Sequence, residues 1–140
     1  MRGGAGVWRI SMALVVIVED EATILVLAES VLQERGHRTM SASSITEATA
    51  LLEENPKIDL LFIDIGLKDD HEAGLKLAVG AVERHPDIKV LYTTGQPVTD
   101  GMKALFVHKS AMLAKPYTVD QLLTSLSMLG INHPDLAVSR

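Results

Sequence analysis

Short apolar runs alternate with segments of helical period along almost the whole chain. Largely apolar runs predict strands at 13–18, 59–63, 88–93 and 110–114, and a weak alternation predicts another at 37–42. Apolar residues at helical spacing predict helices at 21–35, 44–54, 72–84, 98–107 and 118–129. Parallel strands need helical crossovers, which pack on the faces of the sheet. The alternation therefore predicts an α/β fold, a five-stranded parallel sheet with helices on both faces.

Several predicted helices carry boundary signals. The segments 44–47 (Ser-Ile-Thr-Glu) and 118–121 (Thr-Val-Asp-Gln) have the spacing of capping boxes, which satisfy the first backbone N–H groups of a helix. Gly36 and Pro86 follow the first and third helices, where a glycine or a proline ends helical structure.

Composition indicates one globular domain. The chain has 140 residues, of which 47% are hydrophobic and 22% charged. A chain of this length can bury one substantial core. We expect residues 1–12 to be a disordered leader, residues 13–129 to form the domain and residues 130–140 to be a tail.

Charge and hydropathy exclude several classes of partner. A net charge of −5 without a basic stripe argues against nucleic acids and anionic membranes. No apolar run is long enough to span a bilayer, and the N-terminus lacks the apolar region of a signal peptide. The absence of cysteine excludes disulfides and thiolate metal sites. We therefore expect a cytoplasmic protein with no nucleic-acid or membrane partner.

Charged and hydroxyl side chains stand where the predicted strands end. Asp64 follows the buried run 60–63, where an isolated charge is costly. The acidic run 19–21 (Glu-Asp-Glu) follows the first strand, Thr94 ends the fourth and Lys115 follows the fifth. The carboxyl ends of parallel strands meet at one edge of the sheet, where ligands bind in such folds. We expect five of these side chains to share one site, namely Glu19, Asp20, Asp64, Thr94 and Lys115.

The residue types at this edge suit phosphoryl transfer. Carboxylates without His or Cys favour a hard cation, Mg²⁺ or else Mn²⁺, over zinc. That cation and the Lys115 ammonium would offset repulsion among the acids and neutralise an incoming phosphoryl group. An aspartate can accept a phosphoryl group covalently, so Asp64 is the candidate acceptor. The hydroxyl of Thr94 is the candidate donor to a phosphoryl oxygen.

These residues resemble a known family, the receiver domains of two-component response regulators. The resemblance covers about Ala13 to Leu126 and rests on four motifs, Val-Ile-Val-Glu19-Asp20-Glu21, Asp64, Tyr92-Thr93-Thr94-Gly95 and Lys115-Pro116. It implies a CheY-like, flavodoxin-like (βα)5 fold. In that fold the doubly wound sheet has the strand order 2-1-3-4-5.

The resemblance also implies a role for each site residue. Asp64 matches the phosphoacceptor, Thr94 the switch hydroxyl, Lys115 the family's lysine and Pro116 its typically cis proline.

The metal ligands that it implies are Asp20 directly, Glu19 through water, Asp64, and the backbone carbonyl of Gly66. Magnesium is the expected ion, with manganese as the second choice.

One departure from the family concerns the readout of phosphorylation. Receivers usually carry Tyr or Phe three residues before the lysine, and rotation of that ring reports phosphorylation. This chain has Met112 at that position. Tyr92 and Tyr117 are candidates to replace the missing ring.

A second departure follows Asp64. Lys68 stands where the family often has proline, and Gly74 comes two residues later than the usual glycine. We expect an enlarged loop at 68–71. The loop contains His71 beside two aspartates, and we interpret these residues as solvated and not as a metal cluster.

The resulting expectation is a single-domain response regulator. It would accept a phosphoryl group on Asp64 from a histidine kinase or a histidine phosphotransfer protein, and it would not be an enzyme in the ordinary sense. Its output would pass to a protein target through the surface of the fourth helix, fifth strand and fifth helix, a surface that could also form a homodimer.

Other functions fit the sequence less well. A pseudo-receiver that binds proteins without phosphorylation stays open as the alternative. A hydrolase of the aspartyl-phosphate type would need an acid where Gly66 stands, and a flavin site would need a phosphate-binding loop where the chain is acidic.

Overall fold

The computed structural model describes residues 12–131. The predicted leader and tail fall almost entirely on residues 1–11 and 132–140, which lie outside the described residues. Within residues 12–131, five parallel strands form one sheet in the order β2-β1-β3-β4-β5. The predicted doubly wound α/β fold is therefore confirmed.

The elements follow one another in strict alternation. The strands are β1 (Leu14–Val18), β2 (Arg38–Ala42), β3 (Leu60–Asp64), β4 (Lys89–Thr94) and β5 (Ser110–Ala114). The α-helices are α1 (Ala22–Glu34), α2 (Ile45–Glu54), α3 (His71–Arg84), α4 (Asp100–Lys103) and α5 (Val119–Met128), and a 3₁₀ helix, η1 (Leu67–Asp69), precedes α3. None of the helices within residues 12–131 combines the length and apolar character that crossing a bilayer requires.

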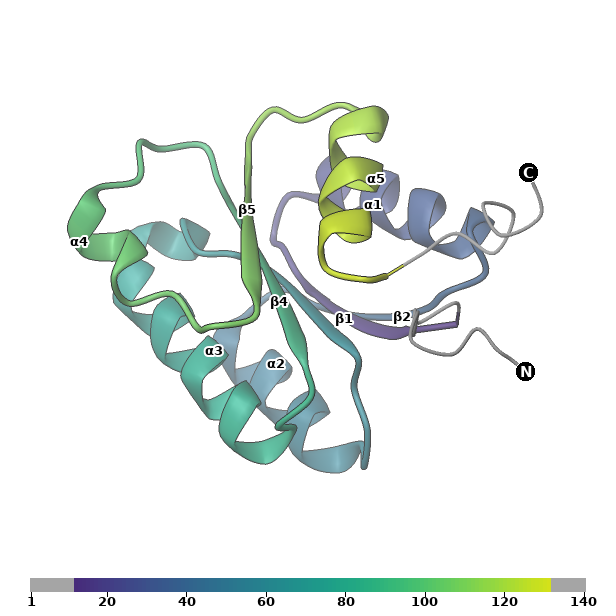
Figure 1. Ribbon diagram of the computed structural model, residues 1–140, viewed down its shortest axis with the longest axis horizontal. Helices are drawn as coiled ribbons and strands as arrows, with labels where there is room; N and C mark the ends of the chain where they lie inside the picture. The colour runs from purple at the N-terminus through teal and green to yellow at the C-terminus, as the bar shows by residue number, and fades with distance from the viewer. Residues whose placement is uncertain (1–11, 132–140) are drawn as a thin grey trace.

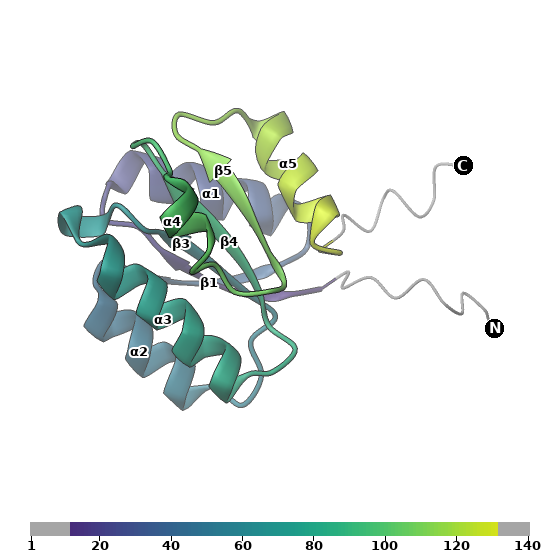
Figure 2. The same ribbon diagram turned by 60° about the vertical axis from the view of Figure 1, so that its left-hand side comes forward.

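Helices cover both faces of the sheet. Figures 1 and 2 show α1 and α5 on one face, and α2, α3 and α4 on the other. Because successive strand residues point to opposite faces, Val15 and Ile17 of β1 join the core under α1 and α5, while Val16 and Val18 join the core under α2 and α3. The strands β1, β3 and β4 are buried on both sides, which explains their continuous apolar runs, whereas the edge strands β2 and β5 are partly exposed.

The register of the strands brings the predicted site residues to one edge. Val18 pairs with Ile63 in the neighbouring strand, so the residues that follow them, Glu19 and Asp64, lie side by side. On the other side of β3, Asp64 pairs with Thr93 of β4. The N–H of Lys115 donates to the carbonyl of Thr94 at 2.9 Å. Lys115, which follows β5, therefore lies at the same edge of the sheet.

Helix capping agrees in part with the sequence. Thr118 and Gln121 form a complete capping box at the start of α5. At α2 the Ser44 hydroxyl accepts the N–H of Glu47 at 3.1 Å, but the Glu47 carboxylate accepts the N–H of Ser43 in place of that of Ser44. The predicted capping box at α2 is therefore incomplete, because the bond from the Glu47 side chain goes to the residue before the N-cap.

The fourth helix is much shorter than predicted. The sequence predicts a helix over 98–107, whereas α4 ends at Lys103. The cause is a tertiary contact, because Phe106 stacks on Tyr92 with ring centroids 4.1 Å apart. The Tyr92 hydroxyl also accepts the N–H of Val107 at 3.0 Å, a bond that takes this N–H out of the helical pattern.

The predicted loop at 68–71 contains a strained turn. Lys68 and Asp69 have φ values of 52° and 57°, in the left-handed region that costs side-chain-bearing residues about 1 kcal/mol each. The buried side chain of Leu67 holds the turn on one side. On the other side Asp70 caps α3 by accepting the N–H of Ala73 at 3.1 Å.

Two glycines of α3 provide a test of its packing. A Cβ at Gly74 would lie 3.2 Å from the Cα of Ile65, whereas a Cβ at Gly80 would meet nothing within 4 Å. We predict that Gly80→Ala raises the free energy of unfolding by about 0.5–1 kcal/mol, since alanine favours the helix. Gly74→Ala should lower it by about 1–3 kcal/mol through overpacking.

Urea denaturation of the dilute protein would measure both changes. Both variants carry a glycine-to-alanine substitution in the same helix, so each serves as the control for the other. A Gly80→Ala variant less stable than the wild type would contradict this account of α3.

Candidate functional site

The carboxylate of Asp64 is held at the end of β3 by two hydrogen bonds. Asp64 is only 6% exposed. Its Oδ1 accepts the N–H of Gly66 at 2.8 Å, and its Oδ2 accepts the Lys115 ammonium at 2.9 Å. These bonds orient the side chain and compensate for much of its lost hydration.

The Lys115 ammonium contacts three carboxylates. Its Nζ lies 2.9 Å from Asp64 Oδ2, 2.9 Å from Glu19 Oε1 and 3.3 Å from Glu21 Oε1. The side chains of Lys115, Glu19 and Asp64 are each less than 10% exposed, whereas Glu21 is at the surface. The lysine precedes a cis peptide bond to Pro116. One cation therefore balances a cluster of acids at the strand ends.

Burial and this ion-pair network shift the pKa values of two members in the same direction. Burial raises the pKa of Glu19, although hydrogen bonds from Lys115 and from the N–H of Glu21 oppose the shift. Burial alone would lower the pKa of Lys115, but hydrogen bonds to Asp64 and Glu19, with their negative charges, raise that pKa overall. Lys115 thus stays charged at any physiological pH.

The acids are close enough to share a metal ion. Glu19, Asp20 and Asp64 each offer a carboxylate oxygen, and the three oxygens lie within 4.8 Å of one another. Among residues 12–131 this is the only such group of His, Cys, Asp and Glu, so the aspartates near His71 do not form a second one. Oxygen ligands of this kind fit a hard divalent cation.

The backbone carbonyl of Gly66, a further predicted ligand, accepts the N–H of Asp69 at 2.9 Å. A carbonyl oxygen has two lone pairs, so one remains for a metal ion. Its role as a ligand stays a prediction.

Gly66 also leaves room between Asp64 and Thr94. A Cβ at Gly66 would lie 3.1 Å from Thr94 Oγ1 and 3.2 Å from Asp64 Oδ1. The hydroxyl of Thr94 accepts the N–H of Gln96 at 3.2 Å. Both side chains are buried and border the same small space, which a larger residue at position 66 would fill.

The two tyrosines named in the sequence lie in different places. Tyr92 is fully buried beside Met112 on the neighbouring strand, on the face of α3 and α4. Tyr117 packs on Phe62 on the opposite face, with ring centroids 6.0 Å apart. Burial, with a further contribution from the charge of Glu19, raises the pKa of Tyr117 to about 12. Tyr92 thus contacts the segment after α4, while Tyr117 lies nearer the acids.

The contact between Glu21 and Lys115 was not foreseen. Glu21 belongs to the acidic run 19–21, but it is not among the residues that we predicted for the site. Its position directly after Glu19 and Asp20 could have indicated this contact, because the chain leaves β1 at this edge of the sheet.

Comparison with known proteins identifies relatives of this chain. The family model described as response regulator receiver domain matches residues 15–127. The sensor histidine kinase AruS of Pseudomonas aeruginosa is 31% identical over 136 residues, which cover 92% of this chain and 13% of AruS. The alginate biosynthesis transcriptional regulatory protein AlgB of the same organism is 30% identical over 109 residues, which cover 77% of this chain and 24% of AlgB. The chain thus spans a small part of either curated relative.

Solved structures agree with the family match. The response regulator receiver protein from Sinorhizobium medicae has a TM-score of 0.74 and 29% identity, covering 84% of this chain and 94% of that chain. A response regulator receiver domain protein from Clostridium thermocellum has a TM-score of 0.70 and 26% identity, covering 90% of this chain and 99% of that one.

Removing the Lys115 charge tests the network. Lys115→Met should lower the free energy of unfolding by about 3–5 kcal/mol at neutral pH, because it leaves buried acids without a counter-charge. The loss should shrink as pH falls. Without Lys115 the buried Glu19 loses the contact that opposes the upward shift of its pKa. An acid whose pKa is raised on folding destabilises the protein increasingly as pH rises above its unfolded pKa, and fully above its folded pKa.

Urea denaturation between about pH 7.5 and about pH 5 would check this pH dependence. Lys57→Met is the matched control, since Lys57 is itself exposed and its ammonium lies 3.8 Å from Asp59, a long ion pair that contributes little. Equal losses for the two variants would contradict the importance of the buried network.

Proposed function

Because the chain belongs to the response regulator receiver domain family, we propose that it accepts a phosphoryl group on Asp64. The donor would be the phosphohistidine of a sensor histidine kinase or of a histidine phosphotransfer protein. Receiver domains are signalling domains of two-component systems and not enzymes of the classical kind. Any catalysis here would be limited to the domain's own phosphorylation and its slow reversal.

One observation carries the proposal. The buried carboxylate of Asp64 is fixed between the N–H of Gly66 and the ammonium of Lys115, with two further acids within 4.8 Å. A structural carboxylate would need only the counter-charge. Additional acids around it make sense if a cation and a phosphoryl group enter the same space.

The transfer balances as a simple displacement. An oxygen of Asp64 would form a bond to phosphorus while the bond from phosphorus to the donor's imidazole nitrogen breaks, and that nitrogen leaves with the electron pair. The Lys115 ammonium would give up part of its contact with the carboxylates and contact the negative phosphoryl oxygens instead. Phosphoryl transfer depends mainly on such positioning and charge neutralisation.

The cation proposed for the acids is Mg²⁺, with Mn²⁺ as the second choice. Glu19, Asp20, Asp64 and the carbonyl of Gly66 would hold it. When bound, the ion supplies positive charge to the phosphoryl oxygens. Asp20 is the exposed member, so it is the acid best placed to exchange water for metal.

The output of the proposed switch begins at Thr94. Its hydroxyl would donate to a phosphoryl oxygen on Asp64, and a contact made only in the phosphorylated state shifts the conformational population. The surface of α4, β5 and α5 would then bind a downstream protein or a second copy. We further propose that residues 13–129 act as a stand-alone receiver in the cytoplasm.

Substitution of Asp64 tests the acceptor. Asp64→Asn should abolish labelling by acetyl phosphate in Mg²⁺, because an amide oxygen is a poor nucleophile. Incorporation would be followed by intact mass. Asp69→Asn, which changes an exposed acid of the neighbouring turn, should label like the wild type. Labelling of the Asp64 variant at the wild-type rate would refute the assignment.

A pseudo-receiver is the alternative, and two observations favour it. Met112 stands where the family's aromatic ring is usual, and Lys68 and Asp69 form a strained turn beside the site. A pseudo-receiver would bind proteins without binding Mg²⁺ or phosphate.

Magnesium binding separates the two functions. We predict that Mg²⁺ raises the thermal midpoint of the wild type and that EDTA reverses the shift, since a ligand of the folded state stabilises it. Asp20→Asn should reduce the shift, whereas Asp100→Asn at the start of α4 should not. If neither magnesium nor manganese shifts the wild type, the pseudo-receiver is correct.

A further inference from the structure

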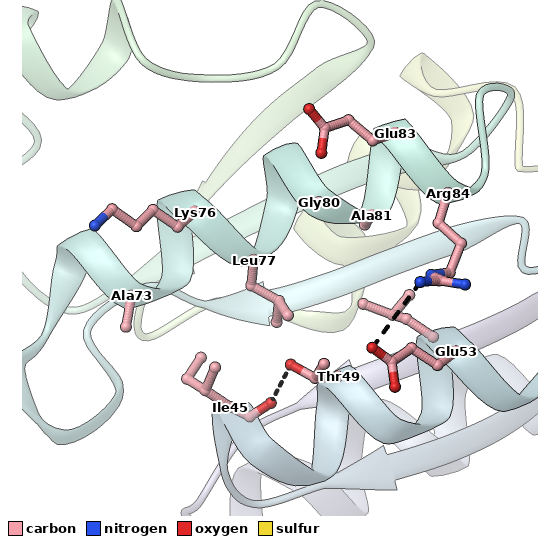
Figure 3. Close-up of a pocket in the computed structure, with 11 residues that line it drawn as sticks. Ile45, Thr49, Glu53, Ala73, Lys76, Leu77, Gly80, Ala81, Glu83 and Arg84 are labelled. Carbon is pink, nitrogen blue, oxygen red and sulfur yellow. Dashed lines mark hydrogen bonds and ion pairs between the residues drawn. The ribbon is translucent and has the colours of Figure 1, made fainter.

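A groove of about 840 Å³ separates α2 and α3, away from the site at the strand ends. Figure 3 shows the residues along both helices that border it. Its apolar lining consists of Ile45, Leu52, Ala73, Leu77, Gly80 and Ala81. Arg84 reaches across one end to Glu53, with 3.9 Å between the charged atoms. The proposed function makes no use of this groove.

Gly80 is the residue that intramolecular packing does not explain. A glycine in the middle of a helix costs stability relative to alanine. Gly74 in the same helix has a packing reason, because a Cβ there would crowd Ile65. No atom lies within 4 Å of a Cβ built at Gly80. The bare backbone at Gly80 therefore leaves space for something outside the monomer.

Val79, next to Gly80, is an exposed apolar side chain. It is 45% exposed, and it follows Lys76 along the outward face of α3. Val79 and Gly80 lie about 100° apart around the helix axis, on either side of the outward face of α3. In an antiparallel twofold pair of α3 helices, each of the two residues would therefore meet its own copy.

The charges on this face have the same symmetry. Lys76 lies three residues before Val79, and Glu83 lies three residues after Gly80. Figure 3 shows Lys76 and Glu83 on α3 on either side of Gly80. Lys76 has an exposed ion pair with Glu72 at 3.9 Å, which contributes little and can be exchanged.

We propose that a second copy of this chain packs on α3, with the two α3 helices antiparallel. A twofold axis at the level of Val79 and Gly80 would place the two Val79 side chains together on one side of the contact and the two Gly80 residues opposite each other on the other side. The same axis would pair Lys76 of each copy with Glu83 of the other. Close approach of two helices at a small residue, with flanking opposite charges, satisfies both the packing and the charge requirements of an isologous contact.

This dimer would be independent of the proposed phosphorylation. Gly80 lies nine residues after the start of α3, or about 13 Å along the helix axis from the end nearest the site. It is also distinct from a dimer through α4, β5 and α5, because β5 is an edge strand of the sheet whereas α3 follows the central strand β3. The contact should form in the unphosphorylated protein without Mg²⁺.

Sedimentation of the full chain over a range of concentrations, without phosphodonor or metal, tests the proposal. The wild type should show a concentration-dependent dimer, whereas Gly80→Gln should stay monomeric and, at dilutions where both proteins are monomers, unfold at a higher temperature than the wild type. That combination cannot arise from misfolding, because glutamine fits the open position and favours the helix.

Charge reversal tests the register of the two helices. Lys76→Glu and Glu83→Lys should each weaken the dimer roughly tenfold or more, because each places like charges together. The double variant should restore dimerisation towards the wild-type level. Leu105→Glu, an exposed position after α4, is the matched control and should leave the dimer unchanged.

Several results would overturn the proposal. These are a wild type that stays monomeric at the highest concentration, a dimer that persists in Gly80→Gln, a dimer lost in Leu105→Glu, or a double variant that fails to recover. A monomer whose α3 is protected from hydrogen exchange only by a histidine kinase would assign the groove to that partner. None of these outcomes alters acetyl phosphate labelling of Asp64, so the proposed function is tested separately.

Discussion

The contact of one ammonium with three carboxylates is the interaction on which the site depends. Asp64 and Glu19 are buried beside each other, and without the Lys115 charge their repulsion and lost hydration would oppose folding. The cost is met because β1, β3 and β5 end at the same edge of the sheet. The fold and the charge cluster therefore support each other, and three of the acids lie close enough together that they could hold a metal ion.

The β4 strand links this cluster to the surface. Thr94 borders the space next to Asp64, and Tyr92, two residues earlier on the same face, holds the segment after α4 by stacking on Phe106 and by a hydrogen bond to Val107. Met112 lies next to Tyr92 on β5. An aromatic side chain is thus present in this region, but it comes from β4 and is fully buried. The short α4 is the structural consequence.

Much of the fold could be predicted, because strands that are buried on both faces of a parallel sheet consist of continuous apolar residues. Each predicted strand agrees with the structure to within a residue or so, and the strand order is confirmed. The helix at 98–107 was wrong in length, since local periodicity cannot register a ring stacked from another strand. The left-handed turn at Lys68 was not predicted either, because lysine rarely adopts a positive φ; Asp69 belongs to a residue type that does so more often, but we drew no prediction from it.

The sequence by itself determined the alternation of strands and helices, and the presence of Glu19, Asp20, Asp64 and Lys115 at strand ends. Both are local properties, set by apolar periodicity and by the residue that follows each run. Only the tertiary structure decided which carboxylates share Lys115, that Glu21 is among them, and that the backbone at Gly80 is open. Those features depend on strand register and helix packing, which bring together residues far apart in the chain.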